Sequence, residues 1–237
     1  MTRWARTPEG GLRGHQQDLP GDEIYQRIRE SVLRNRIGPG TKLAEVKLCE
    51  LFGANREVVR RALIRLASDG LVEYYPKRGA FVASPTDQQV EHVRDARIAI
   101  EGDLAARLAG RIDEAALAEL DRITTEQIDH QRAGELAAAV ELSGTFHVTL
   151  AEAGGNPFCV KYLVELTALT CLAIAKYAVP PNAGCPLDDH ITITAALRTE
   201  DGPRAAELMR THLGRVHKAI LDRARRPAPS PELSDLI

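Results

Sequence analysis

Aromatic residues are scarce in this 237-residue chain, at 4% of the sequence, whereas 44% of its residues are hydrophobic. Any core must therefore be mainly aliphatic, as in many helical bundles. No apolar run reaches the roughly 18 residues that a membrane-spanning helix requires. The polar N-terminus carries arginines but lacks the apolar region of a secretory signal. These absences predict a cytoplasmic protein that does not contact membranes.

Cysteine is also rare, and the cysteines form no C-x-x-C pair. The four positions are Cys49, Cys159, Cys171 and Cys185. Isolated cysteines of this kind are typical of free thiols in a reducing cytosol. The sequence therefore predicts free thiols and no disulfide framework.

A net charge of −2 conceals an uneven distribution of charge. Residues 21–84 hold 12 Lys/Arg against 8 Asp/Glu, a net of +4, and residues 85–226 hold 16 against 21, a net of −5. A basic N-terminal part suits a nucleic-acid partner. The sequence therefore places any DNA contact in the first third of the chain.

Residues 56–67 form the most informative segment, because they give a short helix with two unlike faces. The apolar face consists of Val59, Ala62, Leu63, Leu66 and Ala67, and the opposite face carries Arg56, Arg60, Arg61 and Arg65. One side of such a helix packs into a core while the other faces a DNA groove. Before it, we expect Gly53 to end a helix in the left-handed conformation and Asn55 to cap the next one.

The coarse pattern predicts a mainly α fold in two parts. Residues 22–35, a short segment around Leu48 and residues 56–68 read as helices, followed by a hairpin of residues 71–75 and 79–82. This is a winged helix-turn-helix domain, which we place at 21–84. Six helix-like segments (88–109, 113–132, 134–153, 157–178, 186–200 and 202–225) then predict an antiparallel six-helix bundle. We place a helical effector-binding and dimerisation domain at 85–226, with a flexible arm at 1–20 and a flexible tail at 227–237.

In a winged helix-turn-helix domain the N-terminal residues of the recognition helix lie nearest the bases. These are Asn55 and Arg56, with Arg60 one turn further on, and arginine suits bidentate contact with guanine or phosphate. Lys77 and Arg78 lie at the tip of the wing, from which they reach the backbone or the minor groove. The alternative is that the arginines are solvated surface charges, with Arg61 merely paired to Glu57.

The N-terminal motifs resemble the GntR family of bacterial transcription regulators. The matching segments are Pro39-Gly40-x-x-Leu43-x-Glu45, Gly53-Ala54-Asn55-Arg56, Val59-Arg60-x-Ala62-Leu63, Leu66-Ala67-x-x-Gly70-Leu71-Val72 and Arg78-Gly79-x-Phe81-Val82. The helical C-terminal part is similar to the FadR subfamily, whose FCD domain binds an effector. The resemblance implies DNA contacts at Asn55, Arg56, Arg60 and Gly79. Asn55, Val58 and Arg61 differ from the usual family residues. DNA binding is expected to survive these differences, and the resemblance does not fix the preferred operator sequence.

Three histidines of the bundle fall on apolar stripes of separate helices. His147 shares a face with Val140 and Leu150, His190 with Ile193, and His212 with Leu208 and Val216. Each alone is a candidate core residue. Three inward imidazoles can converge on a divalent metal such as zinc or nickel.

The resemblance implies the same metal site, since many FadR-type bundles hold a metal with an Asp, the His four residues later and two further His. His147, His190 and His212 match the three His positions, but Ser143 occupies the Asp position. Three His with a water or an effector still form a workable site. We therefore predict metal ligation by the three histidines and effector contact at Ser143.

Arg97 lies on the buried stripe of the first bundle helix, and a buried guanidinium needs an anionic partner. Glu101, four residues later, is one candidate. The other is the carboxylate of an effector, which resembles the organic-acid recognition of the family.

Together these features predict a cytoplasmic homodimeric regulator, more often a repressor than an activator in this family. It binds double-stranded DNA at an inverted repeat and senses a small organic acid. Two alternatives remain at this point. One is a metal-dependent hydrolase or lyase built on the three histidines, and the other is an architectural DNA binder with an inert bundle.

Overall fold

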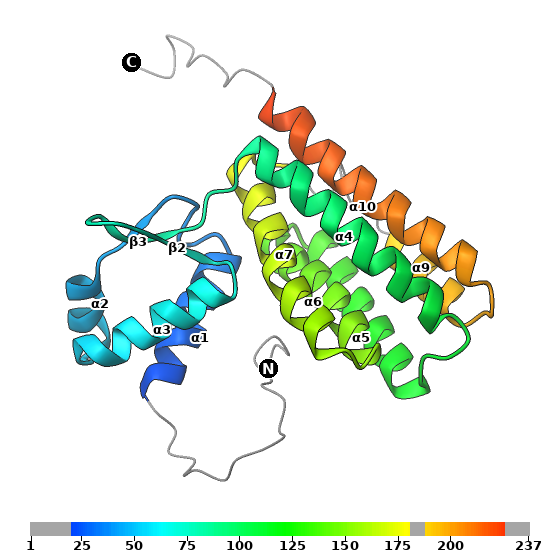
Figure 1. The fold of residues 1–237 in the computed structure, drawn as a ribbon, viewed down its shortest axis with the longest axis horizontal. Coiled ribbons are helices and arrows are strands. Elements are labelled where there is room, and N and C mark those ends of the chain that lie inside the picture. Colours follow the sequence, from blue (N-terminus) through cyan, green and yellow to red (C-terminus); the bar gives the residue numbers. More distant parts are fainter. Residues whose placement is uncertain (1–19, 181–187, 226–237) are drawn as a thin grey trace.

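A computed structural model describes residues 20–180 and 188–225. It contains a small N-terminal module of helices and strands beside a larger bundle of long helices (Figure 1). The predicted arm, apart from Pro20, and the predicted tail lie outside the described residues, as does Cys185. The prediction of a mainly α fold with a winged helix-turn-helix and a helical bundle is confirmed.

The N-terminal module has three helices and a three-stranded antiparallel sheet in the order β1-β3-β2. Its elements are α1 (Pro20–Leu33), β1 (Lys42–Leu43), α2 (Glu45–Phe52), α3 (Arg56–Ser68), β2 (Val72–Tyr75) and β3 (Gly79–Val82). The β2–β3 hairpin pairs Tyr75 with Gly79 and Val72 with Val82, as the wing prediction requires. The sequence did not predict β1, because two residues are too few to show the alternation of a strand.

Local sequence signals set the geometry of the recognition helix. Gly53 ends α2 at φ 60°, a left-handed conformation that glycine adopts without steric penalty. The Asn55 side chain accepts a hydrogen bond of 3.0 Å from the backbone N–H of Val58. Both predictions for this turn are confirmed, so the sequence alone determines where α3 begins.

The apolar face of α3 is buried against α1 and the sheet. Val59, Leu63 and Leu66 are fully inaccessible to solvent, and burial of each such side chain contributes about 1.5–3 kcal/mol. The same core includes Ala168, Cys171 and Leu172 from the bundle helix α7. The N-terminal module is therefore packed onto the bundle rather than tethered to it.

The bundle has six helices within the described residues. They are α4 (Asp87–Leu108), α5 (Glu114–Arg132), α6 (Leu136–Ala153), α7 (Pro157–Lys176), α9 (Asp189–Leu197) and α10 (Gly202–Ala224). The helices α10 and α4 lie side by side, as do α5 and α6 (Figure 1). Thr86 and Gln89 form a capping box at the start of α4. Most predicted ends agree with these bounds within three residues.

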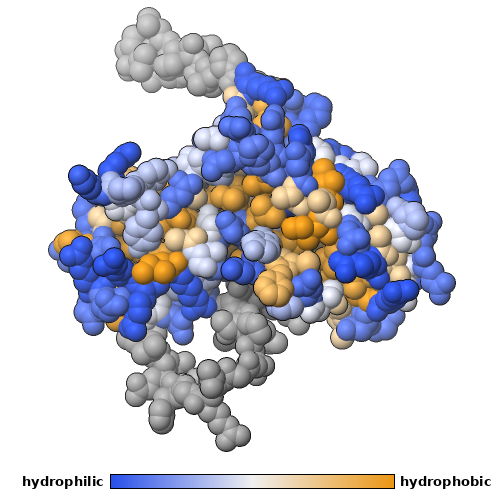
Figure 2. Space-filling view, in the orientation of Figure 1, coloured by the Kyte–Doolittle hydropathy of each residue, from blue (hydrophilic) through white to orange (hydrophobic). Residues whose placement is uncertain are grey.

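By length and composition, α7 is the one helix among the described residues apolar enough to cross a membrane. Instead it packs against α4 and α6. Hydrophobic residues gather in patches over the bundle on the face seen in Figure 2, with hydrophilic residues around them. Phe158 and Tyr162 at the start of α7 are 70% and 51% exposed. They leave an apolar surface on this helix that nothing in the described chain covers.

Candidate functional site

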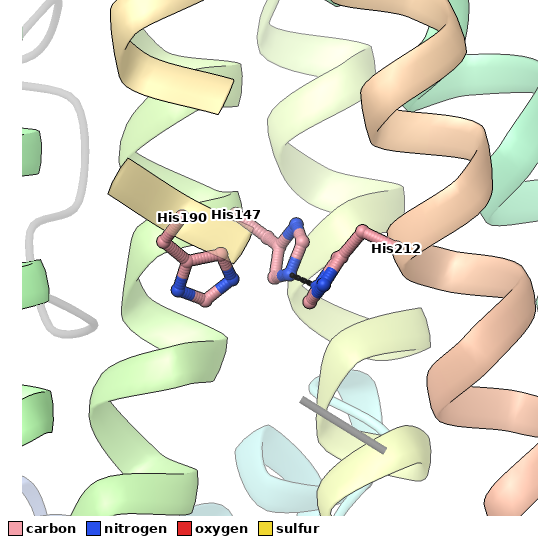
Figure 3. A group of neighbouring side chains, drawn as sticks. All are labelled: His147, His190 and His212. Atoms are coloured by element: carbon pink, nitrogen blue, oxygen red, sulfur yellow. Dashed lines mark hydrogen bonds between the residues drawn. The ribbon is translucent and has the colours of Figure 1, made fainter. Parts of the chain in front are cut away.

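The three predicted histidines meet in the centre of the bundle. His147 projects from α6, His190 from α9 and His212 from α10, and all three are buried (Figure 3). One ligand atom from each lies within 4.8 Å of the others. Residues 65 positions apart in sequence thus share one small site, with the Nε2 atoms of His147 and His212 3.2 Å apart.

Each ring is oriented by an oxygen acceptor on another helix. Nδ1 of His147 lies 2.5 Å from a Glu101 oxygen, and Nδ1 of His212 lies 3.0 Å from an Asp189 oxygen. Nδ1 of His190 lies 2.8 Å from the side-chain oxygen of Gln127. A carboxylate or amide oxygen only accepts, so each Nδ1 carries the proton. This leaves the lone pair on Nε2 in all three rings.

Among the described residues, the Nε2 atoms of His147 and His212 lie within hydrogen-bond distance of each other. Nε2 of His190 is buried without a hydrogen-bond partner among the described residues. Two Nε2 lone pairs 3.2 Å apart, those of His147 and His212, repel each other unless a cation or a proton lies between them. Histidine ligands held by Nδ1–H to an oxygen are the usual arrangement around zinc. The residues present therefore fit a divalent cation.

The electrostatics keep His147 and His190 neutral, which is the form that binds metal. Burial lowers the pKa of His147 to about 4, against the attraction of Glu101. Burial also lowers the pKa of His190 well below its ordinary value, and His212 and His147 lower it further. Burial favours the neutral form of Glu101, but Arg97 and His147 outweigh it and hold the pKa of Glu101 below its usual value.

Arg97 is paired with Glu101, as one of the two predicted alternatives has it. Its Nε donates to Glu101 over 2.6 Å, and Nη1 donates to Thr170 over 3.1 Å, with both charged groups buried. Glu101 thus connects Arg97 to His147 across two helices. Nη2 of Arg97 has no partner among the described residues. Contact of Arg97 with an effector stays a prediction.

Ser143 lies one turn before His147 on α6 and is partly buried. It lines a cavity together with Gln127, the residue that orients His190. The space there is about 500 Å³, which includes the part open to solvent. The structure thus places Ser143 in the wall of this cavity, one turn from His147 on α6.

A fourth histidine, His217, is fully buried beside this network. Its Nδ1 donates to the Leu213 carbonyl over 2.8 Å, and burial together with the charge of Arg97 lowers its pKa from 6.5 to about 3. At pH values between about 3 and 6.5, His217 binds a proton in the unfolded chain but not in the folded chain. The free energy of unfolding therefore falls as the pH is lowered from 6.5 towards 3.

We expect His217→Leu to weaken this pH dependence. Its unfolding free energy, measured by urea denaturation at several pH values from 6.5 downward, should fall less steeply than that of the wild type. The two slopes should differ by up to about 1.4 kcal/mol per pH unit, the value for one proton bound only in the unfolded chain. Parallel slopes for the two proteins would contradict a neutral buried His217.

The predicted DNA contacts form an exposed surface on the N-terminal module. Asn55, Arg56, Arg60 and Arg61 are exposed on α3, and Lys77, Arg78 and Gly79 are exposed on the wing. Gly79 has φ 92°, a conformation that favours glycine. The guanidinium of Arg78 lies 5.2 Å from the centre of the Phe81 ring, which supports it at the tip of the wing.

Arg56 has a partner that the sequence did not reveal. Its Nε donates to Glu45 of α2 over 2.6 Å, although its side chain remains 77% exposed. The contact orients the guanidinium at the start of α3. No spacing rule links residues 11 apart in two helices, so only the fold shows it.

The acceptors of the histidine cluster were also missed, though weak signals existed. Gln127 continues the buried stripe of Leu120 and Ile123 in α5, and a polar residue on such a stripe needs an inward partner. Asp189 directly precedes His190, yet it contacts His212 instead. Glu101 was considered only as a partner of Arg97.

Comparison with known proteins identifies the chain. The model described as "Bacterial regulatory proteins, gntR family" matches residues 20–82, and the FCD domain model matches residues 92–215. The chain belongs to the GntR family. This regulator is 28% identical over 201 residues to the HTH-type transcriptional repressor RspR of Escherichia coli K12, covering 84% of this chain and 87% of RspR. It is 30% identical over 221 residues to an uncharacterised HTH-type regulator of Streptomyces ambofaciens, covering 89% and 88%.

Solved structures agree on the fold of this GntR regulator. A putative GntR regulator from Rhodococcus sp. RHA1 superposes with a TM-score of 0.75 at 20% identity, covering 85% of this chain and 97% of that one. The family consists of DNA-binding transcription regulators, not enzymes. The alternative of a metal-dependent hydrolase or lyase gains no support.

Proposed function

We propose that this GntR regulator is a cytoplasmic, homodimeric repressor that binds an inverted-repeat operator and holds a divalent metal, zinc or nickel, to sense a small organic acid. Residues 21–84 bind DNA and residues 85–226 bind the effector and dimerise. The observation that carries the proposal is the convergence of three buried imidazoles, each with a ligand atom within 4.8 Å of the others.

The ligands of the proposed metal are His147, His190 and His212. Three neutral imidazoles leave a coordination position for a water or a carboxylate. Ser143, one turn before His147 on α6, lines the adjoining cavity and is the proposed effector contact. When bound, the metal supplies the positive charge that attracts a carboxylate. The carboxylates of the protein around the site are already paired with arginines. The protein residues orient the ligand, and Gln127 links the cavity wall to His190.

On the DNA side, the proposed contacts are Asn55, Arg56, Arg60 and Arg61 in the major groove and Lys77, Arg78 and Gly79 at the wing. Support comes from their common exposure and from the burial of the opposite face of α3. A two-fold dimer presents two such helices to the halves of a palindrome. Exposed Phe158 and Tyr162, one turn apart on α7, offer an apolar surface for the partner. The relative RspR is named a repressor, which supports repression here.

A physical connection between the two parts runs through α6. Buried Glu141 of α6 contacts Arg34, which directly follows α1, over 3.4 Å. Glu141 precedes Ser143 by two residues and His147 by six, so the same helix bears the cavity wall and the contact with the DNA-binding module. A ligand changes operator affinity only if it binds the DNA-competent arrangement of the protein and the other arrangement with different affinities.

We expect Arg60→Ala to weaken binding to the preferred operator by about 1–3 kcal/mol while leaving affinity for bulk DNA nearly unchanged. Operator fragments are selected from genomic DNA with the full-length protein, and binding is measured by fluorescence anisotropy at fixed salt. Arg107→Ala, which removes an exposed arginine of α4, is the matched control. Equal operator affinity for Arg60→Ala and the control would contradict the assigned recognition surface.

A further inference from the structure

The cavity next to the histidine cluster is lined mainly by apolar side chains. Aliphatic side chains dominate it, among them Val140, Ile174 and Val216, and Gln127, Gln131 and Ser143 are the polar residues. None of the described residues that line it is charged. A ligand that enters it meets hydrocarbon with few hydrogen-bonding groups.

Three features tie this cavity to the proposed metal ligands. Ser143 lies one turn before His147 on α6, and Val216 lies one turn after His212 on α10. Gln127 contacts His190 directly. The cavity therefore adjoins the cluster along two of its helices, α6 and α10, and through Gln127 of α5, which contacts His190. A short ligand can have one end at the metal and the other in the cavity.

The charges around the cluster limit the charge of such a ligand. Glu101 is neutralised by Arg97, and Asp189 lies 2.8 Å from Arg215. The positive charge of a divalent ion among neutral imidazoles is therefore left for an anionic ligand. A second carboxylate, further along the ligand, would enter a cavity without a cation to receive it, which is costly.

Resting on the proposed function, we propose that the effector is a monocarboxylic acid with a short apolar body, its carboxylate at the metal and its hydrocarbon in the cavity. Sugar acids and dicarboxylic acids are excluded by the same lining. A hydroxyl-rich body would lose its water without gaining equivalent hydrogen bonds.

The test is isothermal titration of the zinc-loaded, full-length protein with acetate, propionate, butyrate and pentanoate. Affinity is expected to rise about fourfold for each added methylene, and pentanoate is expected to bind more tightly than succinate or gluconate. Pentanol, which lacks the carboxylate, should bind far more weakly than pentanoate. Affinity that is independent of chain length, or highest for gluconate or succinate, would overturn the inference.

Val216→Thr places a hydroxyl in the cavity at nearly constant volume and should weaken pentanoate binding about tenfold, while zinc affinity stays unchanged. Val46→Thr makes the same change at a position of α2 that is 66% exposed and should leave both affinities as they are. Zinc uptake is measured separately on each protein. A wild type that takes up no zinc contradicts the proposed metal centre and this inference together, whereas zinc uptake with no preference among the acids contradicts only the inference.

Discussion

Replacing His212 by alanine is expected to abolish stoichiometric zinc binding by the full-length protein. The change removes one of three imidazoles whose ring nitrogens converge in the bundle. It also leaves Asp189 without the ring that it orients. Loss of an outer partner typically costs roughly 10- to 100-fold in metal affinity, and loss of a ligand should cost more. Elemental analysis of purified, dialysed protein measures the result.

The control for this experiment is His130→Ala. His130 contacts Glu135 on the surface between α5 and α6, outside the cluster. This variant should retain one zinc per chain. Full zinc occupancy in His212→Ala would contradict the assignment of the ligands.

Replacing Arg97 by methionine is expected to lower the free energy of unfolding by about 3–5 kcal/mol. Arg97 and Glu101 are almost wholly buried, at 2% and 0% exposure. Without the guanidinium, the buried Glu101 carboxylate keeps only the neutral His147 ring as a partner, so most of the penalty of burying its charge is no longer offset. Urea denaturation of the metal-free protein measures the change.

The double variant Arg97→Met/Glu101→Leu separates this explanation from simple loss of packing. If an unpaired buried charge is the cause, removing both partners should recover much of the lost stability. Part of the loss remains, because His147 also loses its acceptor. If the loss of unfolding free energy in the double variant equalled the sum of the losses in Arg97→Met and Glu101→Leu, the ion-pair explanation would be contradicted.

Local signals were sufficient to predict the DNA-binding module. The cap at Asn55, the helix end at Gly53 and the apolar face of α3 each depend on residues within one or two turns. The β1 strand was not predictable, because it exists only through its pairing with β3. The Glu45–Arg56 contact likewise depends on how α2 and α3 cross.

Only part of the bundle site could be predicted, because its remaining contacts also depend on how helices pack against one another. Periodicity places His147, His190 and His212 on inward faces, and a small bundle brings inward faces together. Periodicity does not show which oxygen meets which ring, because Glu101, Gln127 and Asp189 come from three different helices. For Arg97 the partner at i+4 is one of the two predicted alternatives, and the structure contains it.

The central claim is that occupancy of the bundle site controls DNA binding. The most direct test is operator affinity by fluorescence anisotropy for the metal-free, the zinc-loaded, and the zinc- and pentanoate-loaded protein at one salt concentration. For a repressor, pentanoate should weaken operator binding of the zinc-loaded protein by a factor of about 5–150, the usual range of allosteric coupling, with little effect on the metal-free protein. The same operator affinity in all three states would contradict the account.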